Sequence, residues 1–229
     1  MASVLGTASS ANAVLLRYEF SGVIRDVVFQ SGDFDVATDY LDSVNANVGA
    51  AFSGYYVVDT NVADTNSSPD TGTYLQGAVD FGLRIGDIDG ESIDEDNGSS
   101  RIVAVNNGSS GDLWGLAFTS LFQLDDRIAT SIFDLLLVDS SGAALTSDDS
   151  DQMIPDLAAF DAYDPTAAIF SGLGLFLSID QGNAVFLRGA LTSHRLVVVP
   201  VPGALWLFAG ALVFLRPMTR LGLARKSSA

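Results

Sequence analysis

The chain has 229 residues, no cysteine and a formal net charge of −17 at pH 7. This length suits a single substantial domain, and the lack of cysteine excludes cysteine nucleophiles and cysteine metal sites. The strongly acidic balance argues against nucleic acid or anionic lipid as a partner of the domain.

The first 13 residues end in Ala11-Asn12-Ala13, a small-x-small pattern of the kind that signal peptidase cleaves. A basic region and a full apolar region do not precede this site. Residues 1–13 are therefore either the remnant of a signal peptide whose start lies upstream, which is the favoured interpretation, or an ordinary disordered terminus.

Residues 14–195 alternate between apolar and polar positions in many short segments. The clearest case is residues 79–85, where the odd positions are apolar and the even positions are polar or glycine, as in a half-buried strand. Residues 16–20 alternate in the same way. Further strands are expected at residues 23–29, 51–58, 101–105, 113–122, 132–138, 169–179 and 183–191.

Turn-forming residues separate these segments, at 30–33, 64–72, 87–100, 106–112, 139–142 and 181–183. Residues 179–184 are typical of a hairpin turn that joins the last two strands. Helix is expected only as one or two short turns at residues 155–163. The pattern predicts an all-β ectodomain over residues 14–195, an antiparallel β-sandwich or jelly roll.

The chain ends in a different kind of segment. Residues 196–215 are uncharged and apolar, with Pro200, Val201 and Pro202 near their start, and four cations follow: Arg216, Arg220, Arg225 and Lys226. All 28 acidic residues lie before this segment, so the positive-inside rule places the cations in the cytoplasm and the acidic domain across the membrane.

The apolar core of the tail, residues 203–215, makes only about 20 Å of helix at about 1.5 Å per residue. A full span needs about 20 residues. Residues 196–201 could extend the helix upstream. Residues 218–223 could extend it downstream instead, with Arg216 and Arg220 reaching the head groups. Residues 196–229 are accordingly predicted to hold a transmembrane helix and a basic end.

This order of Pro-x-Pro, short apolar helix and basic end resembles the PEP-CTERM sorting signal of exported Gram-negative proteins. Residues 199–212, VPVPGALWLFAGAL, are similar to the form of the signal that contains tryptophan, here Trp206. The middle residue is Val201, where the namesake motif has glutamate. The ectodomain is also similar to such proteins at residues 18–22, 52–60 and 155–161.

The resemblance implies recognition by an exosortase-like membrane enzyme and cleavage near Pro200–Pro202. It also implies a membrane-anchored precursor that is then released or transferred to the cell surface. Proteins of this type often accompany exopolysaccharide and biofilm loci, which makes an extracellular polysaccharide a possible partner.

Acidic loops are the main candidates for metal binding. Asp87, Asp89 and Glu91 lie in one loop with three further acids, and Ca²⁺ binds where six to eight oxygens converge. An EF-hand does not fit, because its sixth position would be Ser92. A solvated acidic loop is the alternative, and it applies equally to the acids at residues 59–70 and 148–151.

Residues for catalysis do not stand out. His194 is the single histidine and is expected at the surface, and no nucleophile elbow, phosphate-binding loop or zinc-protease motif occurs. Aromatic residues could stack on sugars or pack in the core: Trp114, Tyr55, Tyr56 and Tyr74. Tyr55 and Tyr56 must point to opposite faces of their strand.

The sequence therefore predicts a non-enzymatic exported protein that the tail directs to the cell surface or the polysaccharide matrix. Pro200, Val201, Pro202 and Trp206 are expected to carry recognition. The alternative is a membrane-tethered module that binds carbohydrate or Ca²⁺. A hydrolase is the third hypothesis. The many acidic residues could include a catalytic pair of carboxylates, although the sequence singles out no such pair.

Overall fold

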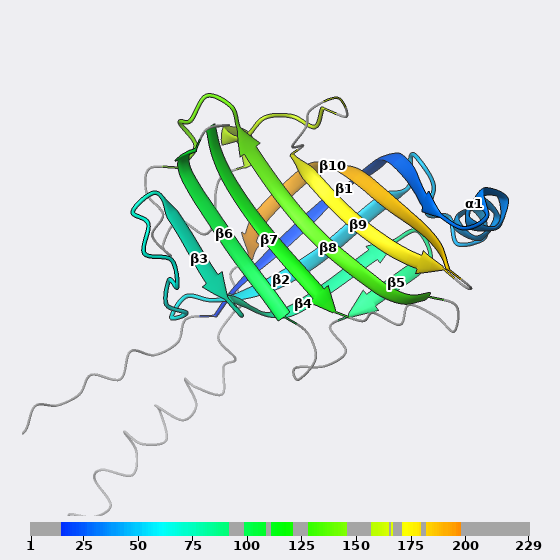
Figure 1. Ribbon diagram of the computed structural model, residues 1–229, viewed down its shortest axis with the longest axis horizontal. Helices are drawn as coiled ribbons and strands as arrows, with labels where there is room; N and C mark the ends of the chain where they lie inside the picture. Colours follow the sequence, from blue (N-terminus) through cyan, green and yellow to red (C-terminus); the bar gives the residue numbers. More distant parts are fainter. Residues whose placement is uncertain are drawn as a thin grey trace, which may run out of the picture. The chain divides into compact units, whose positions relative to one another are not determined.

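The computed structural model describes residues 15–91, 99–108, 111–120, 128–145, 157–164, 166, 171–179 and 182–197. The chain divides into two compact units, Met1–Val197 and Val198–Ala229, and every described residue belongs to the first. This unit is antiparallel and all-β, as predicted (Figure 1). Its strands are β1 (Leu15–Ser31), β2 (Ala51–Asp59), β3 (Thr71–Leu75), β4 (Ala78–Ile85), β5 (Ile88–Glu91), β6 (Ser99–Gly108), β7 (Gly111–Ser120), β8 (Ile128–Asp139), β9 (Gly172–Ile179) and β10 (Asn183–Val197).

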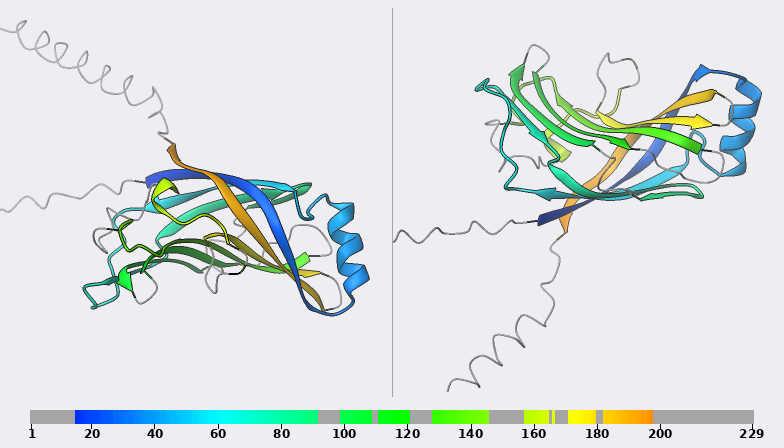
Figure 2. Two further views of the ribbon diagram at one scale, coloured as in Figure 1. Left: turned by 90° about the horizontal axis from the view of Figure 1, so that it is seen from above. Right: turned by 60° about the horizontal axis from the view of Figure 1, so that its bottom comes forward.

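The ten strands form one continuous sheet in the order β3-β6-β7-β8-β9-β10-β1-β2-β4-β5. The first and last strands are neighbours at its centre, and their register runs from Arg17 opposite Val197 to Ser31 opposite Ala184. They form a long ribbon that joins the two halves of the sheet (Figure 2). Leu15 and Val197 consequently lie at the same end of the sheet.

The sheet folds back so that its two halves pack face to face. Phe81 on β4 lies 4.4 Å from Phe133 on β8 and 4.7 Å from Phe118 on β7, measured between ring centroids. These strands are far apart in the sheet order, so the contacts are possible only if the halves face each other. At the edges, the Ser100 hydroxyl on β6 donates to the Ala78 carbonyl on β4 at 2.6 Å.

Two glycines on the ribbon formed by β1 and β10 make room for one aromatic ring where the sheet folds back. Gly22 on β1 and Gly189 on β10 both lie beneath the ring of Phe52, which is buried. A Cβ atom at Gly189 would lie 2.4 Å from Phe52 Cε1, and one at Gly22 would lie 2.3 Å from Phe52 Cζ. The ring therefore fills space that two missing side chains leave in the inner face of the ribbon.

The helix α1 (Phe34–Ser43) lies at the end of the sheet opposite Leu15 and Val197 (Figures 1 and 2). Asp33 is its N-cap, and the Asp33 carboxylate accepts hydrogen bonds from the backbone N–H groups of Asp35 and Val36. Ala37, Tyr40 and Leu41 share one face and join the core. The spacing of these three residues is that of an amphipathic helix.

Two features of the predicted architecture need correction. The expected sandwich or jelly roll would have two separate sheets, whereas the structure has one sheet folded over. The predicted strands at residues 16–20 and 23–29 are a single strand, β1, with irregular pairing at Ser21/Gly22, Ile24/Asp26 and Phe29/Ser31. Every other predicted strand overlaps an observed one. β5 lies in an expected turn, residues 87–100, and β3 begins at the end of another, residues 64–72, whereas α1 lies where no element was predicted.

The last strand also runs further than predicted. β10 continues to Val197, so Leu196 and Val197 pair with β1 and cannot extend an apolar helix upstream. Within the described ranges, no helix has the length and apolar character that crossing a membrane requires. The predicted transmembrane segment lies beyond Val197, outside the described residues. Of the helical turns predicted at residues 155–163, the described part contains one short 3₁₀ turn, Leu157–Ala159.

Candidate functional site: an arginine-lined trough

A trough of about 850 Å³ crosses the outer face of β10, β1, β2, β4 and β5. Alternation along the strands decides which side chains reach it. On β1, Tyr18 and Phe20 point into the core, so Arg17, Glu19 and Ser21 point outward. The register then aligns outward residues from the neighbouring strands across the sheet.

The centre of the trough is a three-layer stack. Gly82 on β4 pairs with Tyr55 on β2, and the Tyr55 ring covers it. A Cβ atom at position 82 would lie 2.4 Å from Tyr55 Cε1, so only glycine lets the ring lie flat on the sheet. The guanidinium carbon of Arg17 lies 3.8 Å above the centroid of the same ring. This cation–π contact holds the Arg17 head group in place.

Two ion pairs flank this stack. Arg195 Nη2 donates to Glu19 Oε2 at 2.9 Å, with side chains 70% and 35% exposed. Arg84 Nε lies 3.5 Å from Asp89 Oδ1, with side chains 62% and 69% exposed. Exposed pairs of this kind contribute only about 0.2–1 kcal/mol each. Both arginines can therefore exchange their partners at small cost.

Serine hydroxyls form a row beside the stack. Ser193 on β10 pairs with Ser21 on β1, and Ser21 pairs with Ser53 on β2. All three line the trough. The surface thus offers guanidinium donors, hydroxyl groups and carboxylate acceptors within one open depression.

The charge of the trough differs from that of the domain. Residues 14–195 contain 28 acidic residues and seven arginines, a net charge of −21. Three of those arginines line the trough, and the described carboxylates that line it are Glu19 and Asp89. The Tyr55 hydroxyl at its centre also donates to Asp80 Oδ1 at 3.4 Å.

A cluster of aromatic rings lies on the inner face behind the trough. Its members are Tyr18, Tyr56, Trp114 and His194, with ring centroids 5.2–6.2 Å apart. The Tyr56 hydroxyl and His194 Nε2 share a hydrogen bond of 2.6 Å. His194 is half-buried and faces inward, so the prediction of a surface histidine was wrong.

Burial sets the protonation state of this cluster. It raises the pKa of Tyr56 well above 10, and the neighbouring Tyr18 adds to the effect. Tyr56 therefore stays protonated and can donate its hydroxyl proton to a neutral His194. Catalysis would need a nucleophile and an orienting acid around the histidine, but its closest neighbours in the described part are aromatic rings.

Of the four aromatic residues expected either to stack on sugars or to pack in the core, three are in the core. Trp114, Tyr56 and Tyr74 are at most 1% exposed, which confirms the core alternative for them. Tyr55 and Tyr56 do point to opposite faces, as predicted. Tyr55 alone reaches the outer surface, and its two ring faces are already covered by Gly82 and Arg17.

Two of the acidic residues predicted to bind metal have protein partners. The Asp87 carboxylate accepts a hydrogen bond from Asn45 Nδ2 at 2.5 Å, and Asp89 pairs with Arg84. Glu91 ends β5, and its side chain lies outside the described residues. Among the side chains that are described, no three acidic or histidine groups gather closely enough to hold a metal ion.

In the second acidic loop, residues 59–70, the aspartate carboxylates accept hydrogen bonds from nearby backbone N–H groups. Asp59 accepts from the N–H of Asn61, and Asp64 accepts from the N–H groups of Asn66 and Thr73. The third acidic loop, residues 148–151, lies outside the described residues. So do the residues predicted to carry sorting and topology: Pro200, Val201, Pro202, Trp206, Arg216, Arg220, Arg225 and Lys226.

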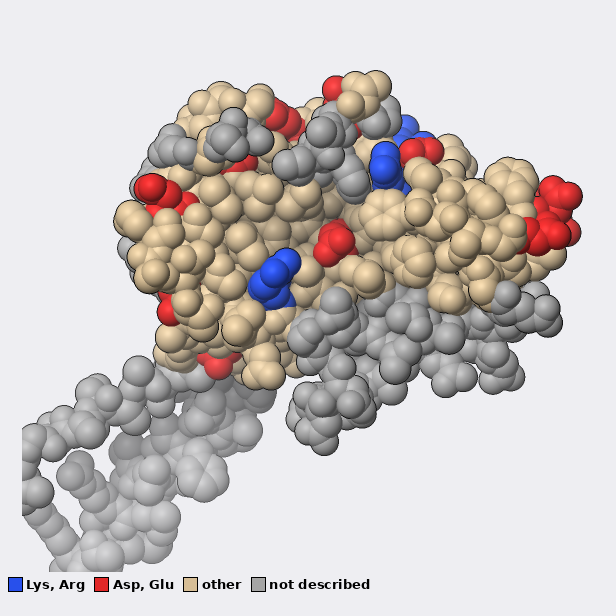
Figure 3. All heavy atoms as spheres, viewed as in Figure 1, with Lys and Arg blue, Asp and Glu red and all other residues tan. Residues whose placement is uncertain are grey.

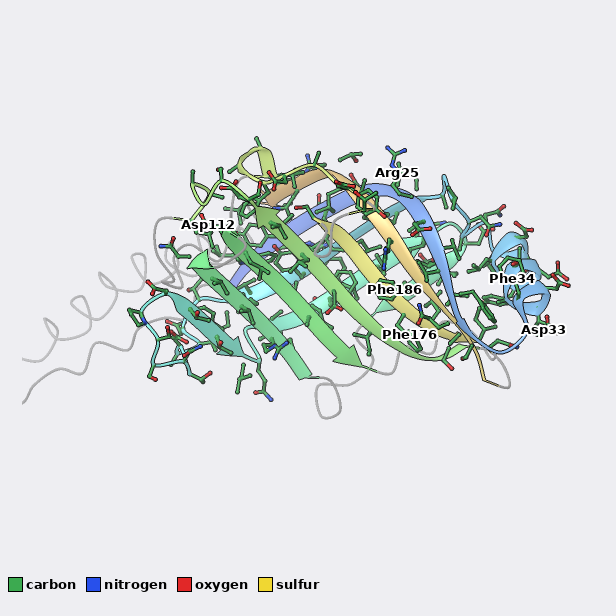
Figure 4. All side chains as sticks on the ribbon, turned by 45° about the horizontal axis from the view of Figure 1, so that its top comes forward. Arg25, Asp33, Phe34, Asp112, Phe176 and Phe186 are labelled. Atoms are coloured by element: carbon green, nitrogen blue, oxygen red, sulfur yellow. The ribbon has the colours of Figure 1, made fainter. Side chains whose placement is uncertain are left out.

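The other outer face, over β6 to β9, is largely uncharged (Figure 3). Phe176 and Phe186 are cross-strand partners there and lie side by side (Figure 4). A depression of about 320 Å³ on this face includes Arg101 and Asp134. Burial raises the pKa of Asp134, and the Arg101 charge opposes this shift.

Arg17, Gly82, Arg84 and Arg195 were not among the predicted site residues. Alternation in residues 16–20 and 79–85 already places the first three on outward positions. The missing information was that β10, β1, β2 and β4 are neighbours, which no local pattern indicates. Comparisons of the chain with protein-family models, curated proteins and solved structures found no match.

Proposed function

We propose that this chain is an exported, non-enzymatic β protein that a PEP-CTERM-like tail directs to the cell surface or the extracellular polysaccharide matrix. The observation that supports this most is the boundary between the two compact units. The first unit ends at Val197, three residues before Pro200. Cleavage near Pro200–Pro202 would leave the described part of β10, Asn183–Val197, intact.

The tail attaches to a defined end of the sheet. Arg17 pairs with Val197, so the described chain enters and leaves the sheet side by side, opposite α1. In the anchored precursor, residues 203–215 with a downstream extension form the membrane helix, and the four cations remain cytoplasmic. Residues 1–13, as a signal-peptide remnant, belong to the same export route.

The test is intact mass and C-terminal peptide mapping of protein from inner-membrane, outer-membrane and released fractions. We expect Lys226 in the inner-membrane precursor and chains ending near Pro202 in the outer or released fraction. A Pro200→Ala/Pro202→Ala variant should accumulate as precursor, while the matched Pro217→Ala control is processed normally. Mature surface protein that retains Lys226 would contradict the proposal.

A second candidate is a membrane-tethered binding module with an uncleaved tail. The arginine-lined trough favours it, because a domain of charge −21 gathers three of its seven arginines on one open surface. Its ligand would be a carbohydrate, or Ca²⁺ at Asp87, Asp89 and Glu91. Calorimetric titration with Ca²⁺ tests the metal, and retention of Lys226 in surface-exposed protein separates this candidate from the first.

A further inference from the structure

We propose that the trough binds the carboxylate groups of an acidic polysaccharide, with Arg17 making the specific contact. This inference names the ligand of the second candidate and rests on its binding role alone. It does not depend on whether the tail is cleaved or kept.

Arg17 is prepared for such a contact by the residue beneath it. One face of its guanidinium lies on the Tyr55 ring, which is itself held flat over Gly82. The edge of the guanidinium carries the N–H donors, arranged as a planar fork that matches a carboxylate. No described carboxylate lies within ion-pair distance of Arg17, so this fork is available to a ligand.

The same stack argues against binding through a sugar–aromatic contact. Tyr55 is the aromatic residue that lines the trough on its outer side, and Arg17 already covers its exposed ring face. The Arg17 guanidinium, and not the Tyr55 ring, therefore contacts the ligand directly. Tyr55 acts as a positioning residue for Arg17.

The flanking arginines favour a polymer with repeated charges. Arg195 on β10 and Arg84 on β4 lie three strand spacings apart, roughly 14 Å at about 4.8 Å per spacing. One carboxylate cannot reach both, whereas successive units of an acidic chain can. Each of these arginines makes an exposed ion pair, Arg195 with Glu19 and Arg84 with Asp89, which a ligand carboxylate can replace; Arg84 Nε also donates to the Gly86 carbonyl at 3.4 Å.

The remaining groups suit a saccharide. The hydroxyls of Ser21, Ser53 and Ser193 can donate to and accept from sugar hydroxyls, and the two displaced carboxylates become acceptors for them. The described large apolar side chains that are exposed, such as Ile132, are not among the residues that line the trough. A lipid chain or an apolar peptide would find little to bury here.

Repulsion by the rest of the domain does not forbid an acidic ligand. The Debye length is about 8 Å at physiological ionic strength, so more distant exposed acids are largely screened. Arg17, Arg84 and Arg195 line the trough itself and therefore act on the ligand at short range.

The experiment is calorimetric titration of the full chain, in mild detergent and EDTA, with an oligogalacturonate. Its fully methyl-esterified form is the matched ligand control, since it has the same rings without the charges. We expect the acid form to bind and the ester to bind at least tenfold more weakly. EDTA ensures that a bridging cation is not responsible. Equal binding of both forms, or binding of neither, would overturn the proposal.

Variants assign the contact to Arg17. We expect Arg17→Gln to weaken binding at least tenfold, and Arg17→Lys to weaken it as well, because lysine lacks the fork. Arg25→Gln removes the same charge from an exposed position outside the trough and should leave the affinity unchanged. If Arg25→Gln weakens binding as much as Arg17→Gln does, bulk charge explains the affinity and the trough does not.

Two further experiments test the positioning role of Tyr55 and binding to lipid head groups. Tyr55→Phe keeps the ring under Arg17 and should retain affinity, whereas Tyr55→Leu should lose it with no change in the thermal midpoint beyond that of Arg25→Gln. Vesicles containing phosphatidylglycerol serve as the lipid probe. Vesicle binding that requires Arg17, without oligogalacturonate binding, would assign the trough to lipid head groups and overturn the proposal. These binding outcomes do not depend on whether the tail is cleaved. The proposal of polysaccharide binding and the proposal of tail-directed sorting can therefore fail independently.

Discussion

The bend of the sheet depends on Phe52 filling the space above two glycines, which makes Gly189→Ala an informative change. The new methyl carbon would lie 2.4 Å from Phe52 Cε1, and its other two nearest atoms, at 3.2 Å, also belong to that ring. Ordinary contact begins at 3.4 Å, so the ring must shift by about 1 Å within a packed core. Overpacking of this kind costs about 1–3 kcal/mol, or roughly 2–4 °C in thermal midpoint per kcal/mol for a domain of this size.

A double-mutant cycle tests the reason for the loss. Phe52→Ala alone should cost about 3–5 kcal/mol. Once the ring is gone, Gly189→Ala should cost almost nothing more, which gives a coupling of about 1–3 kcal/mol. Urea unfolding monitored by the fluorescence of the buried Trp114 measures each free energy.

Gly22→Ala is the matched control, because its methyl carbon would also lie 2.1 Å from the backbone oxygen of Ala190. Removing the Phe52 ring does not relieve that contact, so Gly22→Ala should stay destabilising in the Phe52→Ala background. Additive effects of Gly189→Ala and Phe52→Ala would refute the account of the bend.

Three further predictions concern single side chains. Hydrogen bonds from the Ser141 hydroxyl and then from backbone N–H groups lower the pKa of Asp139 to about 2, below the ordinary 3.8. The stabilisation from this carboxylate is therefore present above about pH 4 and lost as the pH falls through 2. The gap in thermal midpoint between the parent and Asp139→Asn should close over that window, and a constant gap would contradict it. His194→Phe keeps the ring stack but leaves the buried Tyr56 hydroxyl unpaired, which should cost about 1–3 kcal/mol in urea unfolding; Tyr56→Phe in the same background should recover part of this loss. Asp33→Ala removes the cap of α1 and should cost about 1 kcal/mol, whereas the Asp35→Ala control, which does not cap, should cost less.

Local patterns predicted the strands well and their arrangement poorly. Residues 79–85 formed the strongest alternating segment, and β4 occupies almost the same range. Alternation also placed Tyr55 and Tyr56 on opposite faces. It could not show that the first and last strands pair, because that pairing joins residues more than 150 positions apart, such as Phe29 and Val185. The trough spans this junction, so it could not be predicted either.

The missed helix had a readable signal. Asp33 before an apolar spacing of i, i+3 and i+4 at Ala37, Tyr40 and Leu41 is typical of a capped amphipathic helix. No element was predicted for residues 34–43, because Gly32 and Asp33 were taken as turn residues alone. The position of His194 had no such signal. Alternation suggested that the last strand ends at residue 191, but β10 continues to Val197 and carries His194 on its inward face.

The position of the trough also predicts how ligand binding relates to tail processing. Every residue assigned to it precedes Val197, so cleavage near Pro202 leaves the trough complete. Loss of Arg216, Arg220, Arg225 and Lys226 does change the net charge, from −17 to the −21 of residues 14–195. Charges more than about 8 Å from a bound ligand are largely screened at physiological salt, so precursor and processed protein should bind oligogalacturonate equally there if the tail does not reach the trough. At low salt the processed form should bind more weakly. Titration of both forms at the two salt concentrations measures this, and a weaker processed form at physiological salt would mean that residues beyond Val197 belong to the binding site.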